Sequence, residues 1–188
     1  MFDTAEIRRS LRGALELFRG RAEGLAYFDL SVAGFWRSFT AILLVAPLYA
    51  LDVAVGSRGA GPTGTAYFAL KALSYLADWL LFPVLIALLA KPLDFGRLYV
   101  PYIVAYNWSS VVIAALFAPA TLLASAGLLG RGPAAVIGLA LTVVAARYRF
   151  VIARTALQAH PATALGLVLL EFLLSVLVIA IFDRLMPA

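Results

Sequence analysis

Six polar side chains interrupt long apolar stretches of the chain and are the best placed to do chemistry. They are Asp52, Lys71, Asp78, Asn107, Arg147 and Glu171. An ionisable group inside a membrane-spanning helix is costly, so it usually faces the bundle interior or a cavity. Such groups either move protons or ions, or form pairs that fix the register of the helices. The sequence favours the structural use, because the positive and negative charges approximately balance.

Depth along each helix predicts which groups meet. At about 1.5 Å per residue, Asp52 and Lys71 both fall roughly 10 Å below the outer membrane boundary. Opposite charges at equal depth on consecutive antiparallel helices predict an ion pair between these two residues.

A second polar layer is expected closer to the cytoplasm, at roughly 9 to 15 Å from that boundary. It consists of Asp78, Asn107, Arg147 and Glu171. Adjacent helices joined by a short loop are normally neighbours. We therefore expect Glu171 to pair with Arg147, and Asp78 with Asn107.

Motifs for enzymatic or metal chemistry are missing from the sequence. The chain has no Cys and one His, so thiolate metal sites, disulfides and cysteine nucleophiles are excluded. The single His160 precedes Pro161 in a loop, and no phosphate-binding glycine loop or nucleophile elbow is present. We expect a protein that is not an enzyme and that holds no metal and no cofactor.

The elements that carry these residues must be membrane helices. Hydrophobic residues make up 64% of the 188-residue chain and charged residues 13%, and the mean hydropathy is +0.98. Soluble domains are about half apolar and a quarter charged. The composition therefore predicts an all-α bundle in a lipid bilayer rather than a soluble domain.

Five apolar runs are long enough to cross a bilayer, which takes about 20 residues. They cover residues 34–55, 65–90, 98–119, 133–154 and 161–183. Pro119 is expected to end or kink the third helix, leaving 120–130 as an extension or a re-entrant piece. The spacing Ala134-x-x-x-Gly138 permits close helix approach in the fourth run, although it is a weak signal in a chain rich in Ala and Gly.

Basic residues predict the orientation of these spans. One side carries Arg8, Arg9, Arg12, Arg19, Arg21, Arg37, Lys91, Arg97, Arg147, Arg149 and Arg154. The other side carries Arg58, Arg131 and Arg184. Because cytoplasmic loops are rich in Lys and Arg, the N-terminus is expected in the cytoplasm and the C-terminus outside, in a bacterial inner membrane.

Residues 1–33 form a polar segment ahead of the five-span region 34–188. Its apolar residues recur at helical spacing, at Ile7, Leu11, Ala14, Leu15 and Phe18. Its basic face consists of Arg8, Arg9, Arg12 and Arg19. A basic amphipathic helix suits the anionic headgroups of a membrane surface. The alternative is a short helix packed against the end of the bundle. No stacking aromatic residues interleave the arginines on the basic face, so nucleic acid is not an expected partner.

The entry to the first span carries a family resemblance. Phe28-Asp29-Leu30-Ser31, followed by Gly34-Phe35-Trp36-Arg37-Ser38-Phe39, is similar to the corresponding stretch of bacterial Yip1-like membrane proteins. The resemblance lies at the level of topology and implies five short-looped spans after a cytoplasmic segment. The Asp-Leu-Tyr-Gly-Pro signature of the eukaryotic members is absent, so the resemblance implies no trafficking role. The Ala, Arg and Leu bias suggests a high-GC bacterium.

Two functions are compatible with these features. The short loops and the lack of site motifs favour a non-enzymatic accessory or scaffold subunit, docked to itself or to a larger membrane complex. The alternative is a small proton- or ion-coupled transporter or channel that uses the deeper layer of Asp78, Asn107, Arg147 and Glu171.

Overall fold

A computed structural model describes residues 3–57 and 64–185, and all regular structure within these ranges is helical. Arg58, one of the basic residues predicted outside, falls beyond the described residues. The short elements are α1 (Thr4–Phe18), the 3₁₀ helix η1 (Ala22–Tyr27), α2 (Val32–Ser38) and the 3₁₀ turn η2 (Gly96–Leu98). The longer helices are α3 (Ala41–Gly56), α4 (Thr65–Ala90), α5 (Tyr99–Ser125), α6 (Arg131–Ala156) and α7 (Pro161–Arg184).

Five helical segments are long and apolar enough to cross a membrane. They are Val32–Gly56, Thr65–Ala90, Gly96–Ser125, Gly132–Ala156 and Pro161–Arg184. This confirms the predicted all-α membrane bundle with five spans. The chain is an integral, multi-pass membrane protein.

The third spanning helix follows the first of the two predicted alternatives, an extension beyond Pro119. α5 continues past Pro119 to Ser125, so residues 120–125 extend the helix. A proline removes only one helical hydrogen bond, and membrane helices tolerate that loss. The helix ends where Gly127 adopts a φ of 71° and the Leu128 amide donates to the Leu123 carbonyl at 2.9 Å. This is the usual glycine-terminated helix end.

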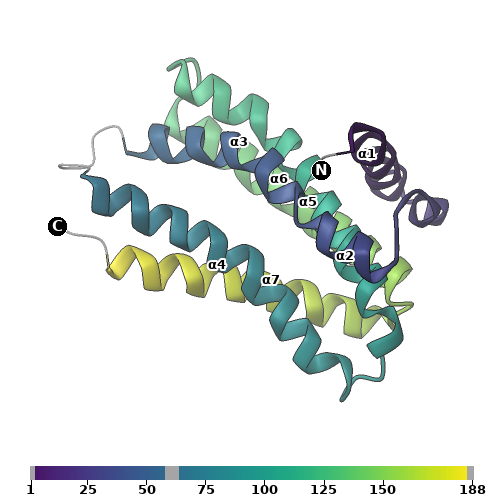
Figure 1. The fold of residues 1–188 in the computed structure, drawn as a ribbon. Helices are drawn as coiled ribbons and strands as arrows, with labels where there is room; N and C mark the ends of the chain where they lie inside the picture. The colour runs from purple at the N-terminus through teal and green to yellow at the C-terminus, as the bar shows by residue number, and fades with distance from the viewer. Residues whose placement is uncertain (1–2, 58–63, 186–188) are drawn as a thin grey trace.

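The central element of the bundle is α5, which contacts α1, α2, α3, α4 and α6. Figure 1 shows α4 lying beside α7, with α3, α5 and α6 grouped on the other side of the bundle. Every residue from Tyr102 to Ser109 on α5 is buried. A helix that is buried all round lies in the core of a bundle. The large exposed apolar side chains lie mainly on α4, α6 and α7, where the surrounding medium must be apolar.

The N-terminal helix α1 packs its apolar face on the protein. Ala14 and Leu17 are fully buried, the Tyr148 hydroxyl donates to the Ala14 carbonyl, and Phe18 meets the Tyr148 ring edge-on at 5.2 Å. The predicted packing of this helix against the bundle therefore occurs, and it is compatible with a basic face at the membrane surface. The basic residues of α1 stay exposed, and their binding to anionic lipid remains a prediction: Arg8, Arg9, Arg12 and Arg19.

Candidate functional site

Residues from all five spanning segments line a partly open cavity of about 310 Å³, whose surface is mostly apolar and carries several polar groups. Its charged lining groups are Asp78 from α4, Arg149 from α6 and Glu171 from α7. Its other polar lining groups are Tyr49, Ser74, Tyr75, Tyr106, Ser110 and Ser175. Small-molecule sites are mostly apolar hollows of about 300 Å³ or more with a few placed polar groups. The size and lining of this cavity fit that description.

An ion pair closes one wall of the cavity. The Arg149 Nε and the Glu171 Oε1 are 3.0 Å apart, and the Tyr106 hydroxyl donates to the same carboxylate oxygen at 3.0 Å. The two side chains are only 11% and 19% exposed. A buried pair of this kind is strongly destabilised when one partner is lost, because the other charge is left uncompensated.

Arg149 is almost saturated with hydrogen-bond acceptors. One terminal nitrogen donates to the Tyr106 carbonyl at 2.8 Å and to the Ser109 hydroxyl, and the other donates to the Ser110 hydroxyl at 2.8 Å. The guanidinium also lies 3.7 Å from the centroid of the Tyr106 ring. These contacts hold the arginine in one position between α5 and α7.

Arg149 takes the place that the sequence analysis assigns to Arg147. Arg147 is exposed on α6. Residues i and i+2 of an α-helix point about 200° apart around the helix axis. Only one of these two arginines can therefore face α5 and α7. The correct signal was available in the Ser109-Ser110 pair of α5, which supplies hydroxyl acceptors for a buried guanidinium.

Asp78 and Asn107 do not meet, although the sequence pattern pairs them. The Asn107 amide donates to the Ser38 hydroxyl at 2.8 Å, and its Oδ1 has no hydrogen-bond partner among the described residues. The Asp78 carboxylate instead lies within hydrogen-bonding reach of Ser175 on α7. The reason is packing: α4 lies against α7, whereas this part of α5 lies against α2.

Lys71 likewise pairs across α4 and α7 rather than with Asp52. Its Nζ is 2.9 Å from the Asp183 Oδ1 near the end of α7, while Asp52 is exposed on α3. The predicted pair of Lys71 with Asp52 is therefore wrong, because the helix that packs beside Lys71 is α7 and not the preceding helix in the chain. Within the described residues, Asp78 is thus the acid that lines the cavity without an ion pair.

Comparison with known proteins adds no relative. No protein family, no curated protein and no solved structure matches this chain. The resemblance to Yip1-like proteins therefore remains a prediction from the sequence. Any function has to be argued from the geometry of the cavity itself.

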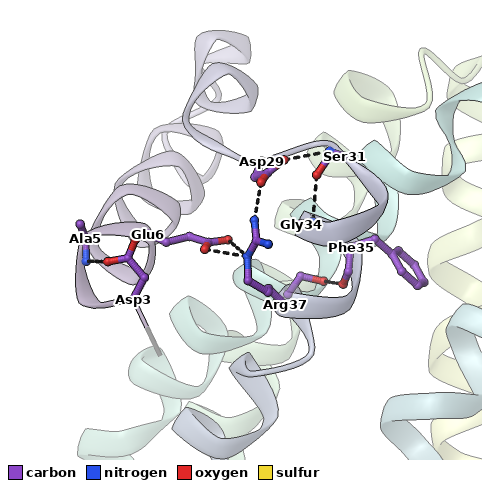
Figure 2. Close-up of polar contacts among 9 residues, drawn as sticks. Asp3, Ala5, Glu6, Asp29, Ser31, Gly34, Phe35 and Arg37 are labelled. Atoms are coloured by element: carbon purple, nitrogen blue, oxygen red, sulfur yellow. Dashed lines mark hydrogen bonds and ion pairs between the residues drawn. The ribbon is translucent and has the colours of Figure 1, made fainter. Parts of the chain in front are cut away.

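A second polar cluster ties α1 to the first spanning segment. Figure 2 shows Arg37 of α2 placed between Glu6 of α1 and Asp29 of the preceding loop. The Arg37 Nε is 2.8 Å from the Glu6 carboxylate. Ser31 caps α2 by accepting from the Gly34 amide at 3.0 Å, and its own amide donates to Asp29 at 2.9 Å. One arginine thus joins three consecutive segments of the chain.

This cluster predicts a loss of α1 docking in acid. Hydrogen bonds from Ser31, with a further contribution from the Arg37 charge, hold the pKa of Asp29 below the ordinary aspartate value of 3.8. A lowered pKa favours folding above the ordinary value, and that contribution disappears as the pH falls through the folded-state value. Hydrogen–deuterium exchange of the α1 amides, corrected for intrinsic rates, should stay constant from pH 6 to about pH 5 and accelerate as the pH falls through 3.8 and below. Asp29→Asn should show fast exchange already at pH 6, and unchanged exchange in this variant would contradict the assignment.

Proposed function

We propose that this integral membrane protein is a small proton- or ion-coupled transporter in which Asp78 is the carrier. The observation that carries the proposal is a cavity lined by all five spanning segments, with Asp78 facing it and making no ion pair with any described residue. Asp78 stands near the middle of the 26-residue α4, about 20 Å from either end. An acid at the middle of a membrane is in the position where a carried proton or ion must be held.

The surrounding charges support a division of roles between the two acids. The titratable groups from other helices that line the cavity with Asp78 are Tyr49, Tyr106, Arg149 and Glu171, and Ser175 is the hydrogen-bonding neighbour of Asp78. Protonating Glu171 would leave the buried Arg149 without its counter-charge, which is costly. Protonating Asp78 breaks no ion pair. Asp78 can therefore exchange a proton or cation while Arg149 and Glu171 keep the helices in place.

An accessory or scaffold subunit is the second candidate. It is favoured by the saturated hydrogen bonding of Arg149, which suits a static network whose task is to fix helix register. In both cases the distribution of Lys and Arg supports an N-terminus in the cytoplasm and a C-terminus in the periplasm of a bacterial inner membrane. For a scaffold, the partner is a second copy or a larger membrane complex.

The proposal is tested by proton flux into vesicles that contain the purified protein and a trapped pH-sensitive dye. A potential imposed with potassium and valinomycin should drive flux through the wild type, and Asp78→Asn should abolish it. The matched control is Asp52→Asn, the same change at an exposed position of α3, which should keep the flux. Wild-type flux in Asp78→Asn would contradict the carrier role. Absence of flux in every protein, together with stoichiometric co-purification of a partner, would favour the scaffold.

A further inference from the structure

Aromatic rings line the cavity on both sides of Asp78. Tyr49 of α3 stacks on Tyr75 of α4 with centroids 4.5 Å apart, and Phe82 of α4 stacks on Tyr106 of α5 at 4.7 Å. Tyr75, Asp78 and Phe82 are separated by three and four residues, which places them on one face of α4. The carboxylate therefore stands between two stacked aromatic pairs that three different helices supply.

The charges of the cavity leave one negative charge uncompensated. Asp78 and Glu171 are acidic and Arg149 is basic, and Arg149 is already paired with Glu171. A ligand that enters with a single positive charge would balance the cavity. An anion would add to the negative charge beside Asp78, and the one arginine has little hydrogen-bonding capacity left for it.

The lining suits an organic cation better than a metal ion. Ca²⁺ and Mg²⁺ require about six or more oxygen ligands, and the described part of the chain contains no group of three His, Cys, Asp or Glu side chains able to hold a metal. Aromatic faces attract alkylated ammonium groups through their electron-rich centres and offer apolar surface to the attached hydrocarbon. A carboxylate flanked by rings matches both parts of such a molecule.

We propose that the cavity binds a monovalent organic cation of the alkyl- or arylammonium class, with its charge at Asp78 and its hydrocarbon part against the half-buried rings of Tyr49 and Tyr75. This inference rests on the proposed function, because it names the substrate class of the same cavity.

The test is calorimetric titration of the purified protein in detergent with benzyltrimethylammonium. We expect saturable binding that Asp78→Asn weakens by about tenfold or more, a loss of roughly one charge contact, and that Asp52→Asn leaves unchanged. Sodium ions and benzenesulfonate should not compete. No saturable binding, binding that is unaffected by Asp78→Asn, or equal competition by sodium would overturn the inference.

Variants of Tyr75 separate the ring from its hydroxyl, which donates to the Ile42 carbonyl at 2.6 Å. Tyr75→Phe keeps the ring and should keep the affinity, whereas Tyr75→Leu should weaken binding about threefold or more. Equal affinity in both variants would remove the aromatic part of the proposal. If proton flux depends on Asp78 but benzyltrimethylammonium does not bind, this inference is wrong and the proposed transport function is still supported. Binding without any flux would support the inference and contradict transport.

Discussion

Replacing Arg149 with alanine should lower the free energy of unfolding by about 3 kcal/mol or more. The substitution strands the Glu171 carboxylate, which is 19% exposed and, among the described residues, keeps only the Tyr106 hydroxyl as a donor. It also removes the donor that the Ser109 and Ser110 hydroxyls share. The expected result is a large drop in the temperature or in the SDS fraction at which the protein unfolds in mixed micelles.

A double variant distinguishes the loss of the ion pair between Arg149 and Glu171 from the loss of the Arg149 side chain alone. Arg149→Ala combined with Glu171→Ala removes both charges, so the double variant should be more stable than Arg149→Ala alone. The matched control is Arg147→Ala, which deletes the same side chain from an exposed position two residues away and should change stability little. If Arg147→Ala were the more damaging single change, the assignment of the buried partner would be wrong.

The sequence predicts the spanning segments of this bundle and the depth of their residues, but not the face of the helix that turns inward. Length and hydropathy locate the five spanning segments, because the bilayer thickness sets how many apolar residues each must contain. Depth follows from position along the helix at a fixed rise per residue. The rotation of α6 does not follow, because Arg147 and Arg149 lie on nearly opposite faces of this helix. Arg147 and Arg149 lie at nearly the same depth, and only packing shows which of them faces inward.

Neighbour relations are the second quantity that the sequence leaves open. The rule that consecutive helices are adjacent predicts contacts of Lys71 with Asp52 and of Asp78 with Asn107. In the structure α4 packs along α7, so Lys71 meets Asp183 and Asp78 meets Ser175. Which helices pack together when they are not consecutive in the chain depends on the packing of whole helix faces. A single sequence does not predict that packing.

The N-terminal cluster was missed for a related reason. Glu6 and Arg37 are 31 positions apart, and their contact exists only because α1 folds back toward the first spanning segment. The amphipathic pattern of α1 correctly predicts a helix with one apolar face. It does not distinguish the lipid acyl chains beneath the headgroups from the apolar side chains of α5 and α6 as the surface that covers that face, because both are apolar.

Alanine at Gly13 or Gly24 should loosen the attachment of α1 to the segment that follows it. The two glycines touch each other: a Cβ at Gly13 would lie 2.7 Å from the Gly24 carbonyl oxygen, and a Cβ at Gly24 would lie 2.6 Å from the Gly13 carbonyl oxygen. Backbone atoms cannot rotate aside as a side chain does, so α1 and η1 must separate. Overpacking of this kind costs roughly 1–3 kcal/mol.

Gly138→Ala is the matched control for this substitution, because a Cβ at this interior position of α6 would meet no atom within 4 Å apart from the adjacent backbone of its own helix. Alanine is favoured over glycine inside a helix by roughly 1 kcal/mol. Gly138→Ala should therefore be neutral or stabilising, while Gly13→Ala gains the same helix preference and still loses stability through the backbone clash. Thermal unfolding and exchange of the α1 amides measure the two effects. Equal stability of both variants would show that α1 tolerates a wider separation from η1, and that the close approach of the glycines does not hold the N-terminal helix in place.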